Sequence, residues 1–74
     1  MNIKTEIQAI IWKIVVEVGQ EIEENQEVII LESMKMEIPI NSNYKGKIKE
    51  ILVKEGDMID EDEAVIILEY FTEP

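Results

Sequence analysis

The chain contains no cysteine, histidine or arginine, and glycine, proline and aromatic residues are scarce. Without cysteine and histidine there is no disulfide, no thiolate or imidazole metal site, and no Ser-His-Asp or Cys-His catalysis. Seven lysines stand against seventeen acidic residues, which gives a formal net charge of −10. Such an acidic chain repels phosphate backbones and anionic lipids, so neither nucleic-acid nor membrane partners are expected.

Long apolar segments are also missing. The first residues carry Lys4 and an early Glu6 but no apolar core, so they do not resemble a secretory signal. No apolar run approaches the about 20 residues of a transmembrane helix. We therefore expect a cytoplasmic protein. The initiating Met1 and the lack of a linker favour a whole protein over an excised domain.

Branched aliphatic residues are what the chain has in abundance. Fifteen isoleucines and six valines outnumber three leucines and two alanines. Side chains branched at Cβ suit a pleated strand and are restricted against a helical turn. The 74 residues leave room for one domain, residues 1–74, which buries only about 60–65% of its unfolded surface.

An internal repeat organises this domain. Residues 9–32 align without a gap to residues 46–69, at an offset of 37, with eleven identities in twenty-four positions. The identities include Gly19 with Gly56 and the five-residue run 28–32 with 65–69. Two copies are too few for a solenoid, which needs about three or more units, so a closed arrangement of two similar halves is expected.

Each copy is predicted to contain a strand, a glycine turn, an acidic stretch and a second strand. Gly19 and Gly56 stand where a tight turn needs a positive φ, which glycine adopts without steric cost. The strands are predicted over residues 11–18 and 27–32 in the first copy, and over 48–54 and 64–70 in the second.

A helix is the competing interpretation of the first copy. Apolar residues from Ile7 to Ile22 recur every three or four positions and would form one stripe. We favour strands because β-branched residues dominate, Gly19 interrupts the stripe, and residues 46–59 lack an equally clean one. Short strands with frequent turns predict an all-β sandwich or barrel, which also closes exposed sheet edges.

The segment between the copies is predicted to form a β-hairpin at residues 33–37. Pro39 cannot donate to a strand ladder, so the second arm is an edge strand or carries a bulge. Continuing the repeat pairs Lys35 with Thr72, which places the lysine at one end of the domain and the termini at the other. Lys35, between Met34 and Met36, is therefore predicted to project from the tip.

A lysine in this position is suited to modification. Its amine ends a flexible four-carbon stem that can enter another protein's active site and be acylated to an uncharged amide. Flexible, polarizable methionine suits packing against a partner. Glu32 and Glu37 favour the charged ammonium, so another enzyme must remove its proton.

The run Glu32-Ser33-Met34-Lys35-Met36 resembles the Glu-Ala-Met-Lys-Met signature of biotin carrier domains, and the likeness extends over nearly the whole chain. It is similar in length to the free-standing biotin/lipoyl attachment proteins. The resemblance implies a flattened β-barrel of two four-stranded antiparallel sheets with pseudo-two-fold symmetry. It implies that Lys35 carries biotin, that Met34 and Met36 are recognised by the ligase, and that the hairpin is framed by Glu32, Ser33 and Glu37.

The function implied is that of a biotin carboxyl carrier without catalytic activity of its own. A biotin protein ligase would modify Lys35, and the domain, expected to be a monomer, would shuttle carboxybiotin between biotin carboxylase and carboxyltransferase. Two alternatives stay open. One is a lipoyl carrier modified with lipoate on the same lysine; the other is a β interaction module that is never modified.

The chain departs from the family pattern in places. Ser33 replaces the usual alanine, Ala9 and Asn25 stand where glycine is frequent, and no thumb loop interrupts residues 28–40. The remaining polar features are expected to be structural. We expect solvated turns at residues 21–24 and 60–63, because they lack calcium-loop spacing. A solvent-facing row is expected at Lys45, Lys47 and Lys49, and Trp12 is expected to pack partly on a sheet face.

Overall fold

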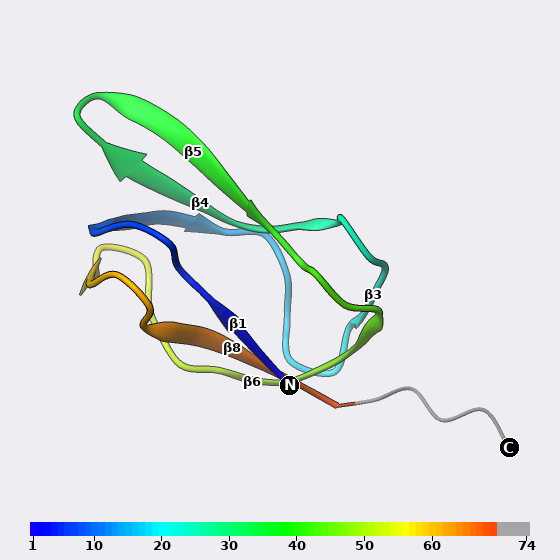
Figure 1. Ribbon diagram of the computed structural model, residues 1–74. Helices are drawn as coiled ribbons and strands as arrows, with labels where there is room; N and C mark the ends of the chain where they lie inside the picture. The colour runs from blue at the N-terminus through cyan, green and yellow to red at the C-terminus, as the bar shows by residue number, and fades with distance from the viewer. Residues whose placement is uncertain (70–74) are drawn as a thin grey trace, which may run out of the picture.

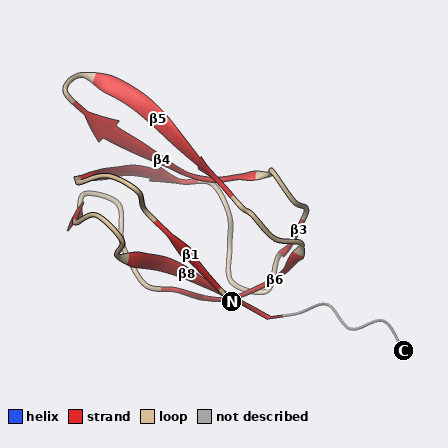
Figure 2. Ribbon diagram, viewed as in Figure 1, coloured by secondary structure: helices blue, strands red, loops and turns tan. Residues whose placement is uncertain are grey.

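The structure is a computed structural model and describes residues 1–69. It is built from strands joined by turns and loops (Figure 2). No helical segment in this part of the chain has the length and apolar character needed to cross a membrane. The eight strands are β1 (Asn2–Lys4), β2 (Ala9–Ile14), β3 (Glu21–Ile22), β4 (Glu27–Ser33), β5 (Met36–Asn41), β6 (Gly46–Ile51), β7 (Met58–Ile59) and β8 (Ala64–Glu69).

These strands form two four-stranded antiparallel sheets, which confirms the predicted fold class. The first sheet has the order β1-β8-β6-β3 and the second the order β5-β4-β2-β7. Each sheet therefore takes strands from both copies of the repeat. Figure 1 shows the β4–β5 hairpin on one side of the molecule and the β1–β8 pair on the other.

The offset of 37 residues relates the two sheets strand by strand. Asn2 pairs with Ile67 in β1–β8, and the equivalent pair in β4–β5 is Pro39 with Ile30. The same relation holds for the segments that follow these strands. Asn25 N donates to Ser42 O and Asp62 N donates to Thr5 O, both at 2.8 Å. The repeat thus extends back to β1 and β5, which the sequence comparison did not include.

The core is made of equivalent residues from the two copies. β-Branched side chains on the inner faces of both sheets exclude water from the space between them, and burying one such side chain fully is worth roughly 1.5–3 kcal/mol. The buried pairs are Ile11 with Ile48, Val16 with Val53, Ile22 with Ile59, Val28 with Val65, Ile29 with Ile66, and Leu31 with Leu68.

Two predicted strands are shorter than expected. The strands predicted over 11–18 and 48–54 end at Ile14 and Ile51, because the chain then leaves one sheet and crosses to the other. Val15 N still donates to Val28 O at 3.1 Å, but Val18 is 63% exposed and lies in the turn. The prediction of strands rather than a helix in the first copy is confirmed.

Other strand ends also differ slightly. The strand predicted over 27–32 extends to Ser33, and the one predicted over 64–70 is described as far as Glu69, with Tyr70 outside the described residues. Thr72, the repeat equivalent of Lys35, lies outside them as well. β3 lies within the first acidic stretch and β7 directly precedes the second, and these two-residue strands place Ile22 and Ile59 in the core.

The predicted glycine turns are confirmed. Gly19 has φ 91° and Gly56 has φ 95°, a conformation that residues with a Cβ rarely adopt. Their amides close equivalent bonds, because Gly19 N donates to Ile48 O at 2.8 Å and Gly56 N donates to Ile11 O at 2.7 Å. Each turn therefore ties one sheet to the other.

Candidate functional site

The segment between the two copies is a β-hairpin closed by a two-residue turn. Ser33 pairs with Met36, so only Met34 and Lys35 lie outside the ladder. Their φ values are 51° and 65°, and positive φ at both central residues defines a type I′ turn. This turn matches the right-handed twist of the flanking strands, which explains why the hairpin can project as a regular ribbon.

The residues in this turn are not those that the turn geometry favours. Type I′ turns prefer Asn-Gly or Gly-Gly, because a Cβ in the left-handed region costs about 1–2 kcal/mol per residue. Here both positions carry long side chains, Met34 and Lys35. Backbone strain of this kind is concentrated at functional sites, where it is maintained by the surrounding structure.

The tip is open to solvent. Met34 is 93% exposed, Met36 is 63% exposed, and Lys35 is also exposed. Within the described residues the one ion pair joins Lys45 to Glu23, so Lys35 is not held by a carboxylate. Figure 1 shows the turn at the far end of the β4–β5 ribbon, away from Met1. The predicted projecting position of the lysine is where the structure places it.

Two carboxylates face each other below the tip. Glu32 on β4 pairs with Glu37 on β5, and both are exposed, whereas Ser33 is half-buried. Like charges in directly opposed positions destabilise a strand pair slightly. Glu32, Ser33 and Glu37 thus flank the turn, at the base of the exposed tip.

The base of the hairpin is anchored to the core. Leu31, which pairs with Ile38, is 1% exposed, and Ile38 and Ile40 are half-buried against the core cluster. β5 is the edge strand of its sheet, in agreement with the expectation from Pro39. The tip is therefore carried by a rigid base, and only the last residues extend beyond the packed interior.

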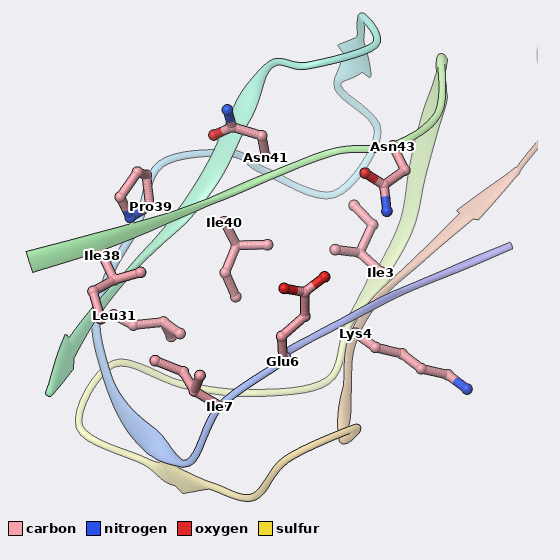
Figure 3. Close-up of a pocket in the computed structure, with 10 residues that line it drawn as sticks. All are labelled: Ile3, Lys4, Glu6, Ile7, Leu31, Ile38, Pro39, Ile40, Asn41 and Asn43. Atoms are coloured by element: carbon pink, nitrogen blue, oxygen red, sulfur yellow. The ribbon is translucent and has the colours of Figure 1, made fainter.

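A small pocket lies where the edge strands β1 and β5 face each other (Figure 3). It has a volume of about 200 Å³ and is lined in part by Ile3, Ile40 and Glu6. Figure 3 shows the Glu6 side chain directed into it. Ligand pockets usually measure about 300–1,000 Å³, and Lys35 is not among the lining residues. We interpret this pocket as the seam between the two halves.

The solvated turns expected over 21–24 and 60–63 are present only in part. Glu21 and Ile22 form β3 and Ile22 is buried, whereas residues 24–25 and 61–62 form turns. Glu23 N donates to Gln26 Oε1 at 2.9 Å, and the equivalent Asp60 N donates to Glu63 Oε1 at 3.5 Å, so a polar side chain bonds to the backbone at each of the two turns. Among the described residues no group of three acidic side chains is placed to hold a metal ion. These residues stabilise the fold and do not contribute to the tip.

The remaining lysines and Trp12 lie on the outer surface. All three lysines of the predicted row are exposed, and Lys45 Nζ lies 3.9 Å from a Glu23 carboxylate oxygen. Trp12 is 38% exposed, with Lys13 Nζ 4.9 Å from its ring centroid. The lysines face solvent as expected, and the exposure of Trp12 agrees with the expected partial packing on a sheet face.

One feature near the tip escaped the sequence analysis. Ile10 and Met58 are exposed apolar residues that pair across β2 and β7, next to Glu32 on β4. The repeat contains a difference at these positions, because Ile10 aligns with Lys47 and Met58 aligns with Glu21. It could not be interpreted without knowing that β7 pairs with β2.

Comparisons with known proteins agree with this geometry. A family model described as "Biotin-requiring enzyme" matches residues 2–68. The biotin/lipoyl attachment protein of Bacillus subtilis (strain 168) is 48% identical over 50 residues, which cover 68% of this chain and 68% of that protein.

Two solved carboxylases contain a similar structure. The urea carboxylase of Kluyveromyces lactis matches 92% of this chain with a TM-score of 0.86 and 34% identity. A single-chain, multi-domain long-chain acyl-CoA carboxylase matches 99% with a TM-score of 0.88 and 14% identity, which shows a shared fold alone. The matched region makes up only 6% and 7% of those two chains.

Proposed function

Because this chain belongs to the family of biotin-requiring enzymes, as a biotin/lipoyl attachment domain, we propose that it is a biotin carboxyl carrier modified on Lys35. One observation carries the proposal: Lys35 is the second residue of a type I′ turn at the exposed tip of an anchored hairpin. We further propose that residues 1–74 form one carrier domain, with no catalytic group of its own.

The residues at the tip fit an amide-linked prosthetic group. The lysine is exposed, and its neighbours Met34 and Met36 are exposed too, so nothing in the described structure covers the amine. Formation of the amide requires attack of the Lys35 Nζ on the carbonyl carbon of an activated acyl group, release of the activating group, and loss of a proton from nitrogen. The proton acceptor must come from the modifying enzyme, because the tip offers only surface carboxylates.

The attached biotin would supply a site that carries a carboxyl group. The chain's own contribution is mechanical. The ribbon β4–β5 holds the attachment point beyond the packed core, and the strained turn fixes the direction in which the lysine leaves the backbone. The expected partners are a biotin protein ligase, a biotin carboxylase and a carboxyltransferase.

Lipoate is the second candidate for the same lysine. It is favoured by the name of the Bacillus subtilis relative, which covers both groups. The methionines on both sides of Lys35 favour biotin, because the signature that this run resembles belongs to biotin carriers. The partner enzymes differ between the two candidates, but the attachment chemistry at nitrogen is the same.

The test is direct modification. The unmodified protein is incubated with a biotin protein ligase, biotin and MgATP, or with a lipoate protein ligase, lipoate and MgATP, and its intact mass is measured. We expect one biotinyl group per chain, located on Lys35 by sequencing of the modified peptide. Lys35→Arg should take up no biotin while its unfolding transition is unchanged.

Three outcomes would contradict the proposal. Biotin on another lysine of the Lys35→Arg variant would refute the site, and a gain of lipoate alone would refute the prosthetic group. No mass gain with either ligase would leave an unmodified interaction module.

A further inference from the structure

The outer faces of the two sheets differ at equivalent positions. In the second sheet, Glu32, Ile10 and Met58 form one row across β4, β2 and β7. The offset of 37 places the equivalent row in the first sheet, where Glu69 on β8, Lys47 on β6 and Glu21 on β3 are paired in the same way. Two positions that are oppositely charged in the first sheet are apolar in the second.

The apolar pair is not required by the fold. Ile10 is 41% exposed and Met58 is 69% exposed, so neither belongs to the core. The first sheet shows that the same backbone accommodates a lysine and a glutamate at these positions. Adjacent exposed apolar side chains are typical of interaction surfaces, so their presence on only one of the two sheets favours a contact made outside the chain.

This apolar pair lies beside the modified turn. A shallow hollow of about 390 Å³ is lined by residues from β2, β4, β7 and the turn, namely Gln8, Ala9, Ile10, Glu32, Ser33, Met34 and Met58. Met34, the residue before Lys35, thus shares one surface with Ile10 and Met58. We call these three residues the apolar patch.

We propose that the apolar patch is the docking surface for the enzyme that acylates Lys35, and that this enzyme presents an apolar centre bordered by cationic side chains. The inference rests on the proposed function. The apolar patch is continuous with the turn that carries Lys35. A protein that covers Ile10 and Met58 therefore also covers Met34 and receives Lys35 at the edge of the contact.

The charge of the partner follows from the border of the patch. Glu32 pairs with Ile10, Glu37 pairs with Glu32, and Gln8, which lines the hollow, donates from Nε2 to Asp60 Oδ1 at 3.2 Å. One carboxylate therefore borders the apolar patch and two more contact its border, in a chain with a net charge of −10. Complementary cationic groups would accelerate the encounter, and salt would weaken it.

A transient enzyme contact fits this surface better than a second copy of the chain. Three apolar side chains are far fewer than the about 20–30 residues that each partner contributes to a stable interface. Two copies would also bring like-charged borders together, which opposes association. A substrate domain must leave after modification, so a small contact suits this role.

The test exchanges the two rows. The double variant I10K/M58E places the charged pair of the first sheet on the second. The matched control, E21M/K47I, places the apolar pair on the first sheet, far from Lys35. Steady-state biotinylation by a purified biotin protein ligase is followed by intact mass, at saturating biotin and MgATP and with the domain varied.

We expect I10K/M58E to raise KM for the domain about tenfold or more, the effect of losing interface anchors, with kcat changed by less than about twofold. E21M/K47I should match the wild type in both constants. Increasing the salt concentration should raise KM for the wild type. Met58→Glu alone, at the more exposed position, serves as a second variant if the double variant unfolds.

The outcomes distinguish a failure of the proposed function from a failure of the docking surface alone. A wild type that accepts neither biotin nor lipoate refutes the proposed function itself. A wild type modified on Lys35, together with folded variants whose KM is unchanged, refutes only the docking surface. A wild-type dimer in sedimentation that I10K/M58E abolishes would assign the patch to self-association and overturn the inference.

Discussion

The hairpin β4–β5 and the strand pair β8–β1 have equivalent strand pairing, but only β4 and β5 are consecutive in the chain. Ile30 pairs with Pro39 in the hairpin, and Ile67 and Asn2, their equivalents at the 37-residue offset, pair with each other in β8–β1. A strained turn joins β4 to β5 and carries the lysine, whereas β1 starts the chain and β8 approaches its end. The two strand pairs therefore share one scaffold, and the candidate site lies at the turn that joins β4 to β5, which has no equivalent between β8 and β1.

The largest expected effect tests whether the two halves share one core. Ile11 and Ile48 are 0% and 1% exposed and occupy equivalent positions. Replacing either with alanine should lower the free energy of unfolding by about 2–5 kcal/mol, from lost burial and the cavity left behind. Urea unfolding measures both, with Val18→Ala at an exposed site as the control.

Equal losses of unfolding free energy would support the symmetry of the core. A large difference between Ile11→Ala and Ile48→Ala would contradict it. If either variant is unfolded without denaturant, the isoleucine-to-valine pair gives the same comparison at about 0.5–1.5 kcal/mol.

The next effect sharpens a difference between the halves. Gly46 and Ala9 are equivalent, but a Cβ on Gly46 would lie 2.5 Å from Glu69 O. Gly46→Ala should therefore destabilise the protein by about 1–3 kcal/mol, as overpacking does. Ala9→Gly, the opposite exchange, should lower stability by only about 0.5–1 kcal/mol. Thermal unfolding of both variants checks this order, and a neutral Gly46→Ala would show that β8 can shift.

A smaller effect tests the buried hydroxyls that follow β1 and β5. Thr5 Oγ1 donates to Ile7 O at 2.7 Å, and Ser42 Oγ donates to Tyr44 O at 2.6 Å. Both residues are fully buried. Thr5→Val and Ser42→Ala should each lower stability by about 1–2 kcal/mol, because backbone groups lose their partner. Denaturant unfolding that finds only one of them destabilising would contradict the equivalence of the two segments.

The smallest expected effect concerns the strained turn. M34N/K35G provides the residues that a type I′ turn prefers and should raise the free energy of unfolding by about 1 kcal/mol, while removing the modification site. Asn25→Gly, at another positive φ, should change stability by only a few tenths of that amount, about 0.3 kcal/mol. Urea unfolding decides, and a loss of stability in M34N/K35G would mean that the long side chains stabilise the turn.

Part of the scaffold was predictable because the repeat is strong. Gly19 and Gly56 matched in sequence and adopt nearly the same φ, and the run 28–32 forms the same central strand as 65–69. β1 was not predicted, because residues 2–4 and 39–41 have only a central isoleucine in common. Two-residue strands such as β3 are too short to show a periodic pattern. The strand predicted to Val18 ends at Ile14, because no sequence pattern indicates where the chain crosses between the sheets.

The lysine and its neighbours were likewise accessible from sequence, and the apolar patch was not. Ile10 and Met58 are far apart in the chain and meet only because β7 adds to the edge of β2. An exposed apolar residue next to charged ones has no significance in a linear pattern. The exposed apolar pair becomes informative when it is compared with the charged pair at the equivalent positions of the other sheet.

Composition and repetition by themselves determined that this chain forms two similar β halves with a lysine between two methionines at the join. Local steric preference and the alternation of apolar residues act between near neighbours, so they can be recognised without coordinates. Tertiary structure alone decided that both halves contribute to each sheet, that Met34 and Lys35 form a turn with positive φ, and that Ile10 and Met58 lie together beside this turn. These features depend on strand pairings between distant segments, whose free energy comes from the whole core.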